Sequence, residues 1–330
     1  MKPTSEQLQK ETTRLYEKLR RTCWTEERCG AIAPLTLEIN ELKKQQNAVI
    51  LAHSYQTPDI MYGVADHIGD SYGLSQIAAQ SNADKIIFCS VYFMGETAKI
   101  LNPDKEVLVP VISGCSLAES ITAADVKNLK KQHPNAPVVC YINTYAEVKA
   151  EADVCCTSAN ALKVIESLPE EEIIFVPDKL MGQNLQKLIT KKLILWDGAC
   201  VVHEEFNAES IIKVRQQYPD AKILVHTECN PAVVGLADLA GSTNDILEYV
   251  KNTNAKNVML ITECGITDRI KTEFKNKNIV GACNLCPYMK KIKLEDILTA
   301  LKNPREDQIV KIPEEIIKKA NLVVNKMLNI

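Results

Sequence analysis

The sequence has 330 residues, which is more than one ordinary hydrophobic core accommodates and predicts two or three domains. Apolar residues make up 46% of the chain and the net charge is −3, so a globular protein is expected, without a basic face for nucleic acid or a membrane. No apolar run reaches the roughly 18 residues of a membrane span, and the first 30 residues lack an apolar signal core.

Helices are predicted at both ends of the chain. Residues 4–22 and 35–46 are rich in good helix formers and contain no Gly or Pro. Residues 302–330 read as a loop with Pro304 and Pro313, followed by a lysine-rich helix. Between these ends, short β-rich runs alternate with helical segments, which is typical of a parallel sheet covered by helices.

The middle of the chain repeats one plan three times. Each copy opens with an apolar strand that ends in polar residues, at 48–56, 137–145 and 222–230. An Ala-Asp pair follows, and a hydroxyl stands five residues after its Asp. The Asp and hydroxyl pairs are Asp66 and Ser71, Asp153 and Ser158, and Asp238 and Thr243. A second apolar strand then leads to a turn with a cysteine, and these are Cys115, Cys200 and Cys286.

Repeats of this size are whole domains. We therefore expect an α/β protein of three similar three-layer αβα domains around a pseudo-threefold axis, with a central active site at the carboxyl ends of the strands. The expected divisions are a helical extension (1–45), three repeats (46–132, 133–217 and 218–302) and a helical tail (303–330).

The three repeated cysteines predict a metal centre. Thiolates favour iron–sulfur clusters or zinc, and a cubane [4Fe–4S] cluster has a threefold axis through each iron. Three protein ligands would leave the fourth iron open, as in a catalytic centre. The alternative is that all three are buried structural residues, because free cysteine is often buried.

The other cysteines carry weaker signals. Cys283 and Cys286 form a CxxC, a weak zinc or redox motif without a second copy, and a disulfide between them is an alternative that would block a ligand. Cys155 and Cys156 lie in a strand and are expected in the core.

Polar side chains are paired at the ends of the three opening strands. The pairs are His53 and Tyr55, Tyr141 and Asn143, and His226 and Glu228. Members of a pair are two residues apart, so each pair is expected on one face of its strand, aimed at the cavity. Ser71, Ser158 and Thr243 are expected at helix starts, where they either cap the helix or help to bind an anion.

At these residues the chain resembles the bacterial quinolinate synthase family, the A protein of NAD biosynthesis. The resemblance covers about residues 35–300. The motifs are HSYQ (53–56), GDS (69–71), FMGETAKILNP (93–103), GCSLAE (114–119), YINTYAEVKAEADVCCTSANA (141–161), FVPDKLMGQN (175–184), WDGACVVHEEF (196–206), HTECNPAV (226–233) and NLCPYMK (284–290). Two positions depart from the family pattern: Ser54 stands for a usual Asn and Thr227 for a common Pro. Both are expected to point away from their functional neighbours, with little effect.

The resemblance implies one [4Fe–4S] cluster per chain, held by Cys115, Cys200 and Cys286. It also implies condensation of iminoaspartate with dihydroxyacetone phosphate to quinolinate, phosphate and two waters. The implied substrate-binding residues are His53, Ser71, Tyr141, Asn143, Ser158, His226, Glu228 and Thr243. Tyr55, His226 and Glu228 are the expected catalytic residues, with proton transfer assigned first to Tyr55 and Glu228.

Other readings of the site remain open at this point. The runner-up is another [4Fe–4S] hydro-lyase acting on a small polyanion. A non-catalytic iron–sulfur sensor would need four protein ligands, and a zinc hydrolase would need a His-rich helix motif that the chain lacks. Transient contact with L-aspartate oxidase or aspartate dehydrogenase is a further expectation, with no nucleic-acid or membrane partner. The expected location is the cytoplasm, or the plastid stroma if an organelle encodes the chain.

Overall fold

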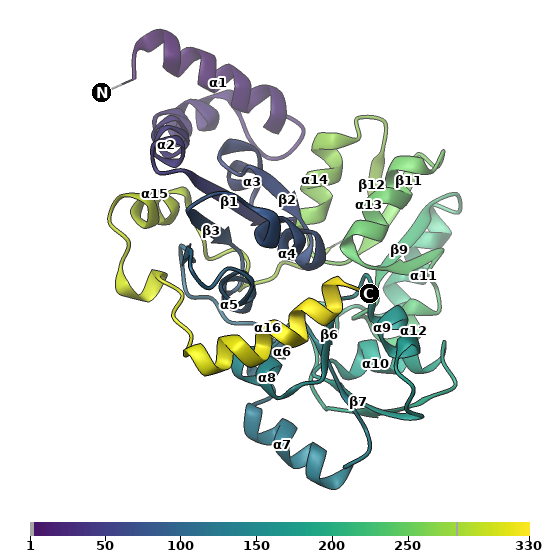
Figure 1. Cartoon of the computed structure of the whole chain (residues 1–330). Coiled ribbons are helices and arrows are strands. Elements are labelled where there is room, and N and C mark those ends of the chain that lie inside the picture. Colours follow the sequence, from purple (N-terminus) through teal and green to yellow (C-terminus); the bar gives the residue numbers. More distant parts are fainter. Residues whose placement is uncertain (1–2, 282) are drawn as a thin grey trace.

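The computed structural model describes residues 3–281 and 283–330 and forms three parallel four-stranded sheets flanked by helices (Figure 1). The first sheet consists of β1 (Ala48–His53), β2 (His67–Gly69), β3 (Lys85–Cys89) and β4 (Glu106–Leu108). The second consists of β5 (Val138–Tyr141), β6 (Val154–Cys156), β7 (Glu172–Val176) and β8 (Lys192–Leu195). The third consists of β9 (Lys222–His226), β10 (Leu239–Gly241), β11 (Asn257–Ile261) and β12 (Asn278–Val280).

The strand order is the same in all three sheets. It runs β2-β1-β3-β4, β6-β5-β7-β8 and β10-β9-β11-β12, so the opening strand of each repeat is always an inner strand. In the first sheet, for example, Leu51 lies opposite His67 on one side and Phe88 on the other. The predicted class of three similar αβα domains is confirmed.

The repeated Ala-Asp pair has a structural role in every domain. The side chain of Asp66 accepts the backbone N–H of Ile50 at 2.8 Å. Asp153 and Asp238 do the same for Val138 and Ile223, at 2.8 Å and 2.9 Å. In each domain this carboxylate holds the segment just before the second strand against the first strand. This contact explains why the Asp stands at the same place in every repeat.

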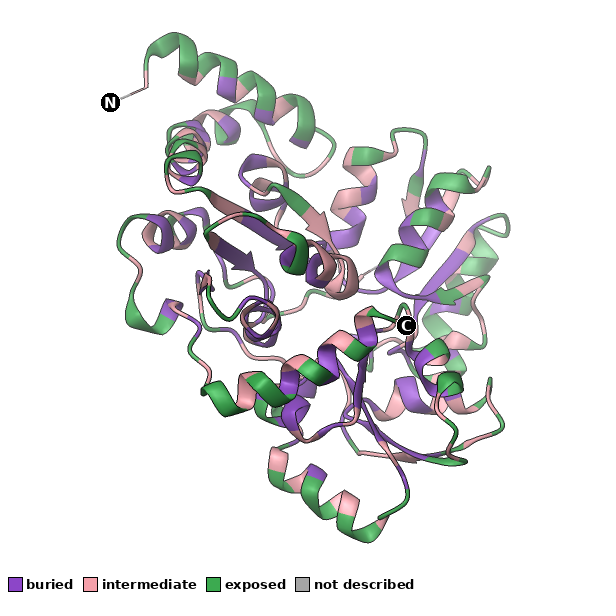
Figure 2. Cartoon of the chain, in the orientation of Figure 1, coloured by how far each residue is buried: buried purple, intermediate pink, exposed green. Residues whose placement is uncertain are grey.

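The helices connect the strands and cover the sheets. In the first repeat they are α3 (Pro58–Gly63), α4 (Ser71–Gln80), α5 (Tyr92–Leu101), α6 (Ser116–Glu119) and α7 (Ala123–Gln132). The next are α8 (Ala146–Glu151), α9 (Ala161–Ser167), α10 (Lys179–Gln186) and α11 (Ala208–Gln217). Those that follow are α12 (Pro231–Val234), α13 (Thr243–Asn252), α14 (Gly265–Glu273) and α15 (Leu294–Lys302). The inner strands of each sheet are largely buried, whereas edge strands such as β2 and the outer helices are partly exposed to solvent (Figure 2).

The two terminal segments are helical. α1 spans Ser5–Leu19, and α2 spans Glu26–Gln45, so the second helix begins well before the predicted residue 35. Its start is fixed by Thr25, whose side chain accepts the N–H of Arg28, and Pro34 is accommodated inside the helix. After a short 3-10 turn, η1 (Glu306–Gln308), the chain ends in α16 (Glu314–Leu328).

Helix α16 packs across the first two domains (Figure 1). Asn321 donates to the carbonyl of Ile100 at 2.8 Å in α5, and Lys326 donates to that of Asp153 at 3.0 Å. The helix therefore fastens the first sheet to the second. None of the helices in the described ranges has the length and apolar character needed to cross a bilayer.

The contact between the first two domains contains a buried carboxyl group. Glu96 of α5 is 8% exposed, and its Oε2 accepts the N–H of Ala146 at the start of α8 at 3.0 Å. Burial raises the pKa of Glu96 to about 7, although the charge of Lys149 acts in the opposite direction. The ionised form is therefore disfavoured in the folded protein.

Glu96→Gln should change how stability depends on pH. Between the ordinary pKa of 4.5 and about 7 the folded state holds a proton that the unfolded state has lost. The contribution of Glu96 to stability is thus complete below pH 4.5 and lost as the pH rises through 7. Between pH 5 and pH 8, the free energy of unfolding of the Gln variant should therefore rise relative to that of wild type, by about 3 kcal/mol at most. Urea unfolding at both pH values measures this. Exposed Glu209→Gln in α11 is the control. A difference between Glu96→Gln and wild type that does not change with pH would contradict the assignment.

Candidate active site

One cavity lies where the three domains meet, and it is lined by residues from all three sheets. Every residue assigned to the site from the sequence lines it: His53, Tyr55, Ser71, Cys115, Tyr141, Asn143, Ser158, Cys200, His226, Glu228, Thr243 and Cys286. The strands β1, β5 and β9 end at His53, Tyr141 and His226, and the second member of each pair lies in the turn that follows. The cavity therefore sits at the carboxyl ends of the strands, as expected for α/β sheets.

His53 and His226 occupy equivalent positions and make equivalent hydrogen bonds. The N–H of Tyr55 donates to Nδ1 of His53 at 3.1 Å, and the N–H of Glu228 donates to Nδ1 of His226 at 3.3 Å. Because Nδ1 accepts, the neutral ring carries its proton on Nε2. Burial, with the charge of Lys290, lowers the pKa of His53 to about 3, and burial lowers that of His226 to about 4 against the opposing charge of Glu228. Both rings are therefore neutral N–H donors at neutral pH.

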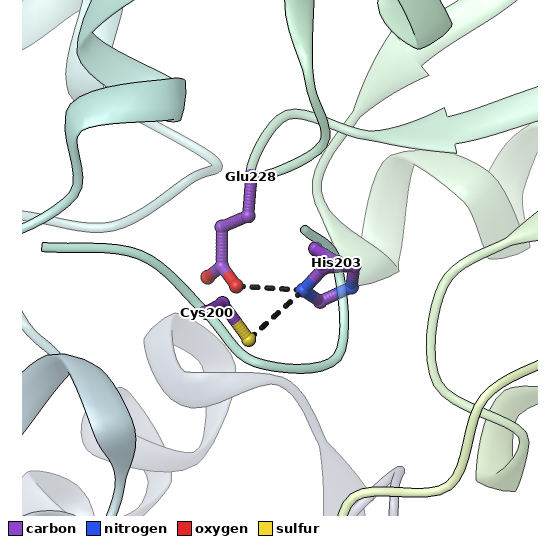
Figure 3. A group of neighbouring side chains, drawn as sticks. All are labelled: Cys200, His203 and Glu228. Carbon is purple, nitrogen blue, oxygen red and sulfur yellow. Dashed lines mark hydrogen bonds and ion pairs between the residues drawn. The ribbon is translucent and has the colours of Figure 1, made fainter. Parts of the chain in front are cut away.

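Glu228 is a buried carboxylate with two donors. The hydroxyl of Tyr141 donates to Oε1, and Nδ1 of His203 lies 2.8 Å from Oε2 (Figure 3). Burial favours the protonated acid, but the hydrogen bonds from His203 and from the Tyr141 hydroxyl stabilise the carboxylate and hold the pKa of Glu228 below its ordinary value. Glu228 is thus ionised and able to accept a proton at neutral pH.

His203 is a site residue that the sequence reasoning missed. It is 2% exposed, its Nδ1 lies 3.3 Å from the sulfur of Cys200, and its ring stacks on His226 with centroids 4.6 Å apart. The Cys-x-x-His spacing from Cys200 was the available signal. Cys200, His203 and Glu228 bring their ligand atoms within 4.8 Å of one another and could hold a metal ion (Figure 3).

Glu263 was also missed, and it supports the loop of Cys286. It is fully buried. Oε1 accepts from the N–H of Cys286 at 3.1 Å and lies 2.9 Å from Nζ of Lys290, while Oε2 accepts from the N–H of Gly265 at 2.6 Å. Its position just after the strand β11 was the only hint in the sequence.

The three predicted ligand cysteines are half-buried free thiols, one from each repeat. Burial raises the pKa of each thiol, to about 12 for Cys115. In each case, hydrogen bonds from the backbone N–H groups two and three residues after the cysteine lower the pKa of the thiol. These pairs are Leu117 and Ala118, Val202 and His203, and Tyr288 and Met289. The same turn thus presents two N–H groups to each sulfur, an arrangement that favours the thiolate once a metal displaces the proton.

The remaining cysteines fall into two groups. Cys155 and Cys156 are fully buried in β6, as predicted for core residues. The suggested disulfide between Cys283 and Cys286 is wrong, because Cys283 is bonded to Cys264. Their Cα atoms are 5.1 Å apart, which suits a disulfide and fastens the loop before Cys286 to the start of α14. Cys286 remains a free thiol.

The predicted hydroxyls lie next to helix starts but do not cap them. The cap of α4 is Asp70, which accepts the N–H of Gly73, and the cap of α13 is Ser242, which accepts the N–H of Asp245. Ser71 and Thr243 are the first residues of these helices, and Ser158 lies in the turn before α9. The capping alternative is therefore wrong. All three residues line the cavity instead.

The two departures from the family motif lie outside the cavity lining. Ser54 is fully buried, and its hydroxyl accepts from Nη1 of Arg269 at 2.7 Å and donates to the carbonyl of Gly69 at 3.0 Å. It therefore joins the first domain to α14 of the third. The backbone N–H of Thr227 donates to the carbonyl of Gly241 at 3.3 Å, and its hydroxyl has no partner among the described residues.

Fold and site together define a three-domain α/β protein with a buried, hydrogen-bond-rich cavity and a thiol from each repeat. The sequence model of the family described as "Quinolinate synthetase A protein" matches residues 37–329. The quinolinate synthase of Sinorhizobium fredii is 45% identical over 322 residues, covering 97% of this chain and 89% of the relative. That of Xylella fastidiosa is 46% identical over 293 residues, covering 88% and 86%, and that of Caulobacter vibrioides is 44% identical over 303 residues, covering 90% and 82%. The chain belongs to the quinolinate synthetase A family.

Proposed function

We propose that this chain condenses iminoaspartate with dihydroxyacetone phosphate to give quinolinate, phosphate and two waters, using a [4Fe–4S] cluster held by Cys115, Cys200 and Cys286. The observation that carries the proposal is the convergence of three free thiols, one per repeat, on the cavity that also holds Glu228 and Tyr55. Family membership supports the product, because the relatives carry quinolinate in their names.

The donor set fits the cluster better than a single ion. Three thiols are soft ligands that suit an iron–sulfur cluster, and each sulfur already faces backbone N–H groups. The competing set of Cys200, His203 and Glu228 is less suitable, because Nδ1 of His203 is engaged with Glu228 at 2.8 Å. When bound, the cluster supplies a Lewis-acidic iron that can polarise a substrate oxygen.

Substrate binding is assigned to the neutral donors around the cavity. His53 and His226 each carry a proton on Nε2 that no backbone carbonyl of the described residues accepts, and Tyr141 and Asn143 add further polar groups. Ser71 and Thr243 place hydroxyls at the first turns of α4 and α13, where free N–H groups and the positive end of the helix dipole favour anions. These groups suit the carboxylates and the phosphate of the two substrates.

Proton transfer is assigned to Glu228, with Tyr55 and His226 assisting. Glu228 is ionised, so it can take a proton from carbon and return it to a leaving oxygen during keto–enol and dehydration steps. Burial raises the pKa of Tyr55 above its ordinary value, so the phenol stays a neutral donor. His226 can hydrogen-bond to a substrate oxygen through Nε2. All three side chains are buried, which limits the access of water to a reactive imine.

The test is product formation under anaerobic conditions. Reconstituted protein is mixed with dihydroxyacetone phosphate and with iminoaspartate formed in place from oxaloacetate and ammonia, a condensation that needs no oxidant, and quinolinate and phosphate are measured by chromatography. We expect equal amounts of the two products, and none without the protein. Dehydration of another hydroxy acid without quinolinate formation would contradict the proposal and favour a different hydro-lyase.

A further inference from the structure

The three loops that carry Cys115, Cys200 and Cys286 have the same local shape. In each loop the N–H group four residues after the cysteine donates to the carbonyl of that cysteine. The donors are Glu119, Glu204 and Lys290, at 2.9, 2.9 and 3.3 Å. We call residues 113–119, 198–204 and 284–290 the first, second and third cysteine turns. Because the turns belong to different domains, the relative positions of the thiols depend on how the turns are joined.

Side chains join the third cysteine turn to the other two. Asn284 of the third turn donates to the carbonyl of Val202 in the second turn at 3.2 Å. Ser113 of the first turn donates to the carbonyl of Tyr288 in the third turn at 2.7 Å. In both bonds the donor stands two residues before its own cysteine, and the acceptor stands two residues after the other cysteine. The two junctions are therefore equivalent under the threefold repeat.

The junction between the first and second cysteine turns is closed by a different residue. The equivalent donor position is Gly198, which has no side chain, and a Cβ there would lie 2.5 Å from the hydroxyl oxygen of Ser120. The hydroxyl of Ser116 instead donates to the carbonyl of Ala199 at 3.0 Å and accepts the N–H of Val201 at 3.2 Å. These bonds hold the backbone on both sides of the second ligand cysteine. The three junctions together form a closed ring of hydrogen bonds.

We propose that Ser113, Ser116 and Asn284 are positioning residues, and that their ring of hydrogen bonds sets the positions of the three thiols before the cluster binds; this inference rests on the proposed function. A cubane cluster requires its thiolates at fixed separations. Ordering the three turns in advance removes the entropy cost of that ordering from the binding step. Groups that orient metal ligands typically change metal affinity or activity by about 10–100-fold when they are removed.

Release of iron from the anaerobically reconstituted protein tests the effect on the cluster. Ser116→Ala removes both bonds to the second turn, so iron should pass to a coloured ferrous chelator about 10-fold faster than from wild type. Asn284→Ala should act in the same direction, and Ser116→Thr, which keeps the hydroxyl, should restore slow release. Ser120→Ala is the matched control, because its hydroxyl donates to the carbonyl of Leu117 at 2.8 Å within its own segment. Wild-type release from Ser116→Ala, or no recovery with threonine, would overturn the inference.

Hydrogen–deuterium exchange of the full chain without a cluster tests the ring independently of iron. In wild type the amide of Val201 should exchange slowly, because Ser116 accepts its hydrogen. That amide should exchange about 10-fold faster in Ser116→Ala and at the wild-type rate in Ser120→Ala. Unprotected exchange in wild type, or no change in Ser116→Ala, would overturn the inference. If reconstituted wild-type protein held no four-iron cluster, the proposed function would fail while exchange still tested the ring.

Discussion

Alanine in place of Cys115, Cys200 or Cys286 should leave protein that cannot assemble a full cluster and forms no detectable quinolinate. Each thiol comes from a different repeat and faces the shared cavity, so the two remaining thiols cannot take the place of a lost one. Iron and sulfide content after anaerobic reconstitution, followed by the product assay, measures the effect. Far-ultraviolet circular dichroism establishes that each variant is folded.

Two controls make this result specific to the ligands. Cys156→Ala removes a thiol buried in β6, and Cys283→Ala breaks the disulfide with Cys264. Both should keep a full complement of iron. If Cys286→Ala retained the cluster while Cys283→Ala lost it, Cys283 would be the ligand and the register of the third repeat would be shifted.

Glu228→Gln should separate proton transfer from cluster assembly. The amide keeps the shape of the side chain but cannot take up a proton, and the loss of a general acid–base group typically lowers the rate by about 10²–10⁴-fold. Tyr141 and His203 face different carboxylate oxygens, and the amide replaces one of these with NH₂, so one of the two donors loses its acceptor. The cluster should assemble normally because no cysteine changes. Steady-state kcat, with intermediates trapped by rapid quenching, measures the effect.

Glu205→Gln provides the matched control, because Glu205 lies in the same segment as His203 but is exposed to solvent. It should leave kcat unchanged. Turnover of Glu228→Gln close to that of wild type would remove Glu228 from the mechanism and leave it only the role of anchoring His203.

The repeat was sufficient to predict the arrangement of domains and most of the cavity. An apolar strand, an Asp that ties the next segment to it and a closing cysteine recur at one spacing, so equivalent side chains had to reach equivalent strand ends. Because β1, β5 and β9 end at the same edge of their sheets, the polar residues after them converge. This is why His53, Tyr141 and His226, which were expected to face the cavity, line it.

The residues that were missed depend on contacts between domains. His203 matters because it touches Glu228 and Thr262, which are distant in sequence, and nothing local to residue 203 specifies those neighbours. The disulfide of Cys283 likewise depends on how its loop lies over α14. The caps at Asp70 and Ser242 were misassigned because each stands directly before a hydroxyl residue, Ser71 or Thr243, that can also cap a helix, and only the helix geometry distinguishes the two.

Metal and sulfide analysis of the anaerobically reconstituted protein, with Mössbauer spectroscopy of ⁵⁷Fe, tests the central claim most directly. The account predicts about four irons and four sulfides per chain, as in a cubane cluster. It also predicts that His203→Ala keeps this content while Cys200→Ala loses it. A single bound zinc or iron that His203→Ala abolishes would contradict the account, since that result would assign the metal to Cys200, His203 and Glu228 instead.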